Sequence, residues 1–218
     1  MTYEEIKKDK EILTYIQQAD ECLGALGYTE HSLAHVTHCA KTAGKLLTDL
    51  GYDKHTVQLA QIAGHLHDVG NMVNREAHAQ SGAILAFSLL RARGMDPADV
   101  AEVVTAIGNH DEGTGRPVSP MAAALILADK SDVRRSRVRN QEESKFDIHD
   151  RVNYSVRESE LAIDEDRTVI WLKLTVDTTY GSVMDYFEIF MGRMLLCRKA
   201  AEALGLQFKL MINGQALI

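Results

Sequence analysis

The stretch His67-Asp68-Val69-Gly70 decides how the rest of this chain is interpreted. It follows an apolar run, 57–66, that is typical of a buried helix. Neighbouring helical residues point about 100° apart, so His67 and Asp68 cannot both lie inertly on one face. Both side chains can reach a point beside the helix edge. A nitrogen and a carboxylate oxygen at one point suit iron, manganese, zinc or cobalt, so the dipeptide predicts a metal site if other ligands converge on it.

His110 and Asp129 are two such candidates, because each lies at the end of a predicted helix on its apolar face. Steps of four and three residues carry that face from Val103 through Ile107 to His110. Asp129 lies four residues after Leu125, at the end of an almost wholly apolar stretch. Because a charge on a core face needs a partner, Asp129 is predicted to bind a cation.

His35 and His78 complete the set, since each lies in a segment with a helical pattern, 29–36 and 75–83. The predicted metal ligands are therefore His35, His67, Asp68, His78, His110 and Asp129. Six ligands are more than one ion needs, so their number favours two ions bridged by a carboxylate.

The order of these residues resembles the HD-domain superfamily of metal-dependent phosphohydrolases, in its variant with two additional histidines and a two-metal centre. The similarity covers most of residues 28–140 and rests on the segments HLHDVGN, HAQSGA, AIGNHDEGTGRP and LILADKSDVRRSRV. Asn71 stands where many members have a lysine, which puts that lysine's phosphate contact in doubt. Asn109-His110 replaces the His-His pair of cyclic dinucleotide phosphodiesterases, and the chain also lacks their GYP turn, which argues against that subgroup.

The resemblance implies a hydrolase in which two divalent ions, bridged by the catalytic Asp68, activate water to attack a phosphoester or phosphoanhydride. One ion would be held by His35, His67 and Asp129, and the other by His78 and His110. Iron or manganese is expected, with zinc, cobalt, nickel or magnesium as alternatives.

The expected substrate is a phosphorylated small molecule, a nucleotide above all. His31, Lys130 and Arg137 are predicted to contact it; for the two cations the competing interpretation is a solvated helix face. Two other functions stay open. One is a di-iron oxygenase of the same superfamily, and the other is a metal-binding signalling module without turnover.

Composition restricts the class of protein. The chain has 218 residues, of which 45% are hydrophobic and 25% charged, as in ordinary globular proteins. A net charge of −7 argues against general nucleic-acid binding. Three cysteines without a CxxC motif suit a reducing cytoplasm, where we expect this protein. The sequence begins with no signal-peptide pattern and has no apolar run approaching about 18 residues, so no membrane partner is expected.

The periodicity predicts a mainly α protein with three parts: an HD-type helical domain over 1–140, a linker or extension over 141–151, and a small α+β module over 152–218. Helices are predicted over 3–26, 31–50, 54–69, 77–93, 97–110 and 120–139. The module is predicted to contain strands 152–163, 168–176 and 206–212 and a helix 182–204, in the order ββαβ.

This module raises the question of a partner chain. One helix covers only one face of a three-stranded sheet, and the other face would bear some of the side chains Trp171, Leu172, Leu174 and Val176. The module therefore packs back on the helical domain or pairs with a second copy. The exposed strand edges and the frequency of twofold dimers favour a homodimer.

Overall fold

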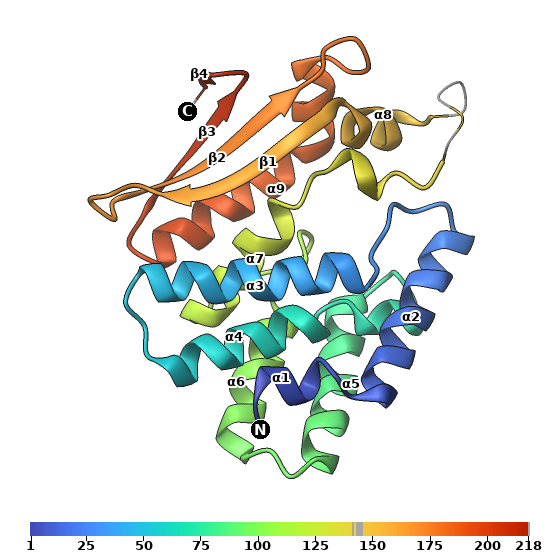
Figure 1. Cartoon of the computed structure of the whole chain (residues 1–218), viewed down its shortest axis with the longest axis vertical. Helices are drawn as coiled ribbons and strands as arrows, with labels where there is room; N and C mark the ends of the chain where they lie inside the picture. The colour runs from blue at the N-terminus through green and yellow to red at the C-terminus, as the bar shows by residue number, and fades with distance from the viewer. Residues whose placement is uncertain (141, 143–145, 218) are drawn as a thin grey trace.

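A computed structural model describes residues 1–140, 142 and 146–217. Figure 1 shows helices gathered at one end of the molecule, with the N-terminus, and a sheet at the other end, with the C-terminus. The mainly helical fold with a small α+β C-terminal part is thereby confirmed. None of the helices in the described ranges has the length and apolar character needed to cross a membrane.

The elements follow the predicted order. The helical part contains α1 (Tyr3–Ile6), α2 (Lys10–Ala25), α3 (Leu33–Asp49), α4 (Lys54–Leu66), the 3-10 helix η1 (Val69–Met72), α5 (His78–Ala92), α6 (Pro97–Gly108) and α7 (Pro120–Lys130). The rest contains the 3-10 helix η2 (Arg135–Arg137), α8 (Ile148–Ser155), β1 (Val156–Ile163), β2 (Val169–Val176), α9 (Val183–Ala203), β3 (Gln207–Ile212) and β4 (Gln215–Ala216).

The predicted helix 3–26 is two helices, because Asp9 starts a new one. Its carboxylate accepts hydrogen bonds from the backbone N–H groups of Glu11 and Ile12, at 3.0 and 3.1 Å. These groups have no partner within the helix, and an aspartate at this position satisfies them. At the other end Gly27 adopts a φ of +82°, which ends α2 where the sequence predicted.

The prediction of a helix over 120–139 is wrong beyond Lys130, where α7 ends. Asp132 turns inward, and its carboxylate lies 2.7 Å from Nδ1 of His35. Its backbone carbonyl accepts a hydrogen bond of 2.6 Å from the Arg137 guanidinium. Tertiary hydrogen bonds thus replace those that a longer helix would have made.

A second correction concerns the start of the C-terminal part. Residues 152–155 were predicted in a strand but belong to α8, whose first turn is capped by the Asp147 carboxylate accepting from the N–H of Asp150 at 2.7 Å. The predicted linker, 141–151, falls partly on residues 141 and 143–145, which lie outside the described part of the chain.

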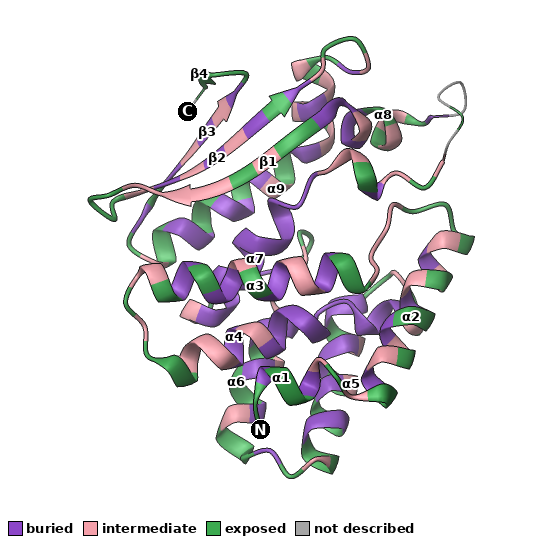
Figure 2. Ribbon diagram, in the orientation of Figure 1, coloured by how far each residue is buried: buried purple, intermediate pink, exposed green. Residues whose placement is uncertain are grey.

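Helix α7 is the element that both parts of the molecule share. Every residue from Met121 to Lys130 is buried, as Figure 2 shows by its colour. On one side α7 packs in a core built from α1–α6; on the other, Ile126 and Leu127 join a core with α9 and the sheet. The C-terminal part therefore packs back on the helices, with α9 in contact with both α7 and β3.

The sheet has the order β1-β2-β3-β4, with β2 and β3 parallel across the α9 crossover. Leu172 and Leu174 face the buried side. Trp171 points the other way, and the ammonium group of Lys209 lies 5.4 Å from the centre of its ring. The outer face thus carries Trp171 and a charge rather than the leucines, and the homodimer stays a prediction.

Candidate metal centre

All six predicted ligands are buried and meet between the helices. His35 lies on α3, His67 and Asp68 directly follow α4, and His78 is the first residue of α5; His110 follows α6, and Asp129 lies in the last turn of α7. Five separate segments thus bring their side chains to one place, as the apolar spacing predicted.

Four ligand atoms surround one candidate ion position. Nε2 of His35 lies 3.5 Å from Oδ2 of Asp68 and 3.4 Å from Oδ1 of Asp129. Nε2 of His67 lies 3.3 and 3.7 Å from the same two oxygens. Ligands about 2 Å from a shared ion are separated by such distances, so these four residues fit one divalent cation.

A second candidate position lies on the other side of Asp68. Its Oδ1 is 3.7 Å from Nε2 of His78, and that nitrogen is 3.2 Å from Nε2 of His110. Oδ2 of Asp68 thus faces His35 and His67, and Oδ1 faces His78, which lies beside His110. This is the arrangement that a carboxylate bridging two ions requires.

Two buried atoms at the centre make no hydrogen bond within the described residues: Nε2 of His67 and Oδ2 of Asp68. Leaving such atoms unsatisfied costs about 1–3 kcal/mol each. Burial lowers the pKa of His67, but Asp68 and Asp129 outweigh it and raise that pKa to about 10. The carboxylates therefore demand positive charge between these side chains, and a divalent ion supplies it.

Three of the histidines are oriented in the same way. His67, His78 and His110 each place Nδ1 near the backbone carbonyl oxygen three residues earlier, at 2.8, 3.1 and 2.6 Å. When Nδ1 donates its proton there, Nε2 is left as the lone-pair nitrogen that faces the centre. Burial and the charges of His67 and Lys130 lower the pKa of His110 to about 3, so its imidazole is neutral, as a ligand must be.

His35 is oriented by a carboxylate that the sequence analysis missed, Asp132, whose Oδ2 lies 2.7 Å from Nδ1. Asp132 is itself held by the Arg134 guanidinium. Burial opposes its ionisation, but its hydrogen bond with His35 and the charge of Arg137 keep its pKa well below the usual value. The only signal in the sequence was its position three residues after Asp129.

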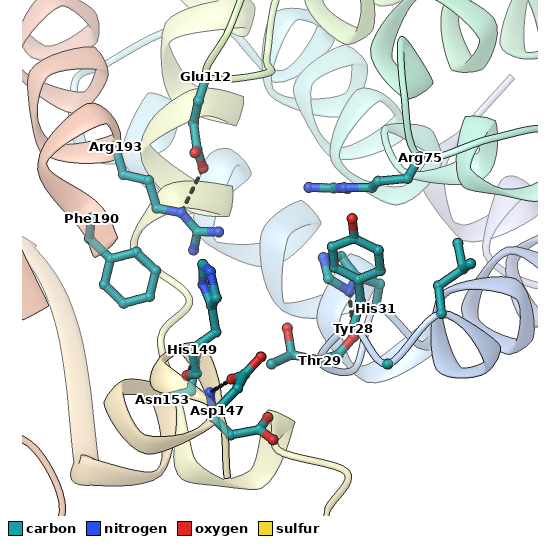
Figure 3. A pocket seen from close by; sticks show the side chains of 13 residues that line it. Tyr28, Thr29, His31, Arg75, Glu112, Asp147, His149, Asn153, Phe190 and Arg193 are labelled. Carbon is teal, nitrogen blue, oxygen red and sulfur yellow. Dashed lines mark hydrogen bonds and ion pairs between the residues drawn. The ribbon is translucent and has the colours of Figure 1, made fainter. Parts of the chain in front are cut away.

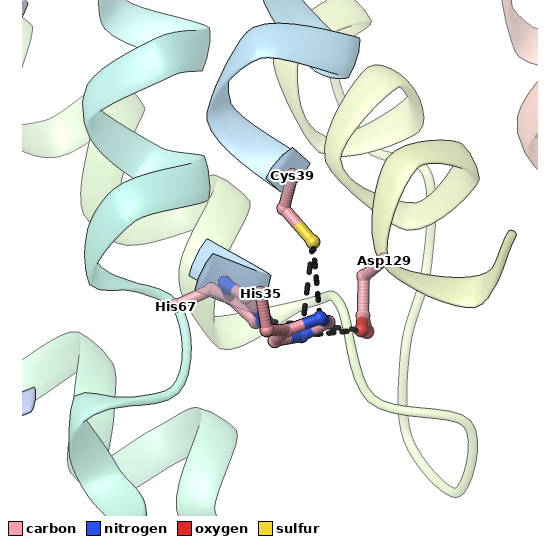
Figure 4. A group of neighbouring side chains, drawn as sticks. All are labelled: His35, Cys39, His67 and Asp129. Carbon is pink, nitrogen blue, oxygen red and sulfur yellow. Dashed lines mark hydrogen bonds and ion pairs between the residues drawn. The ribbon is translucent and has the colours of Figure 1, made fainter. Parts of the chain in front are cut away.

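Cys39 also approaches this group, as Figure 4 shows. Its sulfur lies 3.7 Å from both ring nitrogens of His35. Equal distances to the two nitrogens place the sulfur beside the ring and not in front of Nε2. Cys39 therefore packs against a ligand and is not placed as the fifth ligand of the same ion.

The three predicted substrate contacts lie in different settings. His31 lines a cavity beside the centre, and its ring centre is 5.4 Å from that of His35. Lys130 is buried, with its ammonium group 2.7 Å from Oδ2 of Asp129. Arg137 donates to the backbone carbonyl of Glu30 at 2.9 Å as well as to that of Asp132. Substrate contact by all three stays a prediction. In this structure the Lys130 ammonium group and the Nε and Nη1 atoms of Arg137 are paired with protein groups.

The cavity measures about 390 Å³ and has charged residues on its walls (Figure 3). Arg75 lies closest to the metal ligands, because its Nη1 is 3.5 Å from Nε2 of His78 and 3.2 Å from Oδ1 of Asn71. Asn71 in turn donates to Oδ1 of Asp68 at 2.8 Å. Arg75 was not singled out in the sequence, since it lies just before the helix predicted over 77–93, where charged residues are ordinary.

Comparison with known proteins finds similar sequences and a similar solved structure. An uncharacterized protein of Methanocaldococcus jannaschii, MJ1020, is 26% identical over 196 residues that span 78% of this chain and 74% of the relative. Ribonuclease Y of Lawsonia intracellularis is 34% identical over 108 residues, which are 48% of this chain and only 18% of the enzyme. The crystal structure of a predicted HD superfamily hydrolase from an uncultured Thermotogales bacterium is 28% identical, with a TM-score of 0.46, and covers 57% of this chain and 67% of that one.

The HD-domain profile matches residues 28–153, more than half of the chain. That range contains every one of the six converging ligands and ends before α9. The chain therefore belongs to the HD-domain family.

Proposed function

We propose that this protein is a metal-dependent phosphohydrolase that cleaves a phosphoester or phosphoanhydride bond of a small molecule, with nucleotides as the expected substrates. The observation that carries the proposal is the geometry of the Asp68 carboxylate, in which Oδ2 faces His35 and His67 while Oδ1 faces His78. Family membership supports it, because the matched range includes these ligands.

The candidate ligands fall into two groups, one for each ion. His35, His67 and Asp129 would hold one divalent ion, His78 and His110 the other, and Asp68 both. When bound, such a pair acidifies a water molecule and offsets the negative charge of a phosphoryl group.

Arg75 supplies the protein's own positive charge at this point. It adjoins His78 and is held by Asn71, the residue that stands where many family members have a lysine. We therefore assign the grip on the reacting phosphoryl group to Arg75, whose planar guanidinium suits phosphate oxygens.

The test is phosphate release by the purified chain loaded with Mn²⁺ or Fe²⁺, using p-nitrophenyl phosphate and a set of nucleotides. Asp68→Ala should lower kcat/KM at least about 10²-fold, the usual cost of removing a group that stabilises transition-state charge. Asp166→Ala, at an exposed turn position, is the matched control and should act like the wild type.

Equal turnover by wild type and Asp68→Ala would contradict the proposal, since a contaminant would then account for the activity. Oxygen consumption by the iron-loaded chain, without phosphate release from any tested substrate, would favour the oxygenase alternative instead.

A further inference from the structure

The cavity beside the metal centre has walls from both parts of the molecule. His31, Arg75 and Glu112 lie within the range matched by the HD-domain profile. Phe190 and Arg193 lie on α9, well beyond residue 153, and line the same cavity. The C-terminal part therefore shapes the site where a substrate would lie, although it supplies none of the metal ligands.

Arg193 is connected to the centre by a chain of ion pairs. Its Nε lies 2.6 Å from Oε1 of Glu112, and the same oxygen lies 3.5 Å from the ammonium group of Lys130. Lys130 in turn lies 2.7 Å from the ligand Asp129. These alternating charges fix the position of Arg193 relative to the ion that Asp129 would bind.

The two terminal nitrogens of Arg193, Nη1 and Nη2, take no part in this series of ion pairs. Its guanidinium carbon lies 4.5 Å from the centre of the Phe190 ring, a cation–π contact that restricts the movement of the group. Across residues 1–140, 142 and 146–217, neither Nη atom of Arg193 has a hydrogen-bond partner. Figure 3 shows them pointing into the cavity, on the wall opposite Arg75. A guanidinium so placed offers two parallel donors to an anionic group.

The remaining wall limits where such an anion can lie. Asp147 and Asp150 of the α8 region line the cavity as well, and they would repel it. The carboxylate of Asp147 already accepts from the N–H of Asp150, as the helix cap. Anionic groups of a substrate are therefore favoured beside Arg75 and Arg193. The wall with Asp147 and Asp150 suits hydroxyl groups of a substrate, which can donate hydrogen bonds to carboxylates.

We propose that Arg193 is a specificity-determining residue that binds a second anionic group of the substrate, a phosphate or carboxylate. The reacting phosphoryl group would lie on the opposite wall, at the metal centre beside Arg75. A volume of about 390 Å³ accommodates a small molecule that carries both groups. This inference rests on the proposed phosphohydrolase function.

A pair of ligands that differ by one phosphoryl group tests it: glucose 6-phosphate and glucose 1,6-bisphosphate. Their dissociation constants are measured with the Mn²⁺-loaded full chain, by calorimetry or as inhibition constants against p-nitrophenyl phosphate. The bisphosphate should bind wild type at least about tenfold more tightly, the effect of a charge-assisted hydrogen-bonded pair. Arg193→Ala should remove that preference, and Arg193→Lys should restore part of it.

Arg198→Ala is the matched control, since Arg198 lies on the same helix but is 56% exposed in its side chain and 4.0 Å from Glu202. It should keep the wild-type preference. The inference is overturned if wild type binds both ligands equally, or if Arg193→Ala weakens both by the same factor, as a merely structural role would. If the wild type does not hydrolyse p-nitrophenyl phosphate, the proposed function is rejected. The preference for the bisphosphate can still be measured by calorimetry, which needs no turnover, so the two failures are distinguishable.

Discussion

Asp68 is the residue on which the geometry of the centre depends. The side-chain amide of Asn71 donates to Oδ1 at 2.8 Å and to the Asp68 backbone carbonyl at 2.9 Å. The carboxylate is thereby held in one orientation, with Oδ2 towards His35 and His67 and Oδ1 towards His78. Burial opposes ionisation of Asp68, but His67 and His31 hold its pKa well below the usual value. A charged carboxylate with a fixed orientation can set the spacing of two ions.

The hydrogen bond between Asp132 and His35 is expected to strengthen metal binding. Asp132→Asn removes the negative charge that makes His35 a stronger donor to a metal, so the affinity for Mn²⁺ should fall about 10–100-fold. Competition with a chromophoric chelator measures this affinity. The exposed Asp166→Asn should bind Mn²⁺ as the wild type does. Unchanged affinity in Asp132→Asn would show that His35 does not depend on this partner.

The convergence of the six candidate ligands could be predicted from the sequence, but the cavity residues could not. His110 and Asp129 interrupt apolar faces, and a polar residue in such a position is visible in the periodicity alone. Arg75 and Arg193 lie in segments where charged residues are ordinary. They face one cavity only because α9 packs against α7. This is a tertiary contact that no local sequence pattern predicts.

Helix α7 holds Asp129 in position at the metal centre. It ends at Asp129 and Lys130 and is buried from Met121 to Lys130, between the helical core and α9. This explains why its sequence is apolar on every side. A displacement of α7 would move a metal ligand and the ion-pair chain to Arg193 together.

Leu127→Ala tests the contribution of this packing to stability. Leu127 is fully buried in the core shared by α7, α9 and the sheet, so the free energy of unfolding should fall by about 2–5 kcal/mol. Leu195→Ala on α9 is the control, because its side chain is 43% exposed and the change should stay within about 0.5 kcal/mol. Urea denaturation measures both; equal effects would contradict the assigned burial.

The ends of elements were predicted where local residues set them. Gly27 and Gly51 have positive φ values and end α2 and α3 within two residues of the predicted positions. The end of α7 and the start of β1 were not predicted, because distant residues decide them. The segment after α7 is turned by a contact with α3, and residues 152–155 continue a helix that begins beside the cavity.

The whole molecule has two hydrophobic cores joined through α7, with the metal centre within the helical part and a wall of its cavity from α9. The C-terminal part is thus attached to the helices along α9. The homodimer stays a prediction, but the unpaired sheet face that motivated it is not apolar. The edge strand β1 exposes Arg157, Glu158 and Glu160, and such charges discourage pairing between sheets.

Anomalous X-ray scattering from crystals grown with Mn²⁺ tests whether one chain holds two ions through Asp68. We expect two manganese peaks about 3.5–4 Å apart with Asp68 between them. His35, His67 and Asp129 should bind one, and His78 and His110 the other. A single peak, or two peaks whose ligands do not include Asp68, would contradict a two-ion centre bridged by this residue.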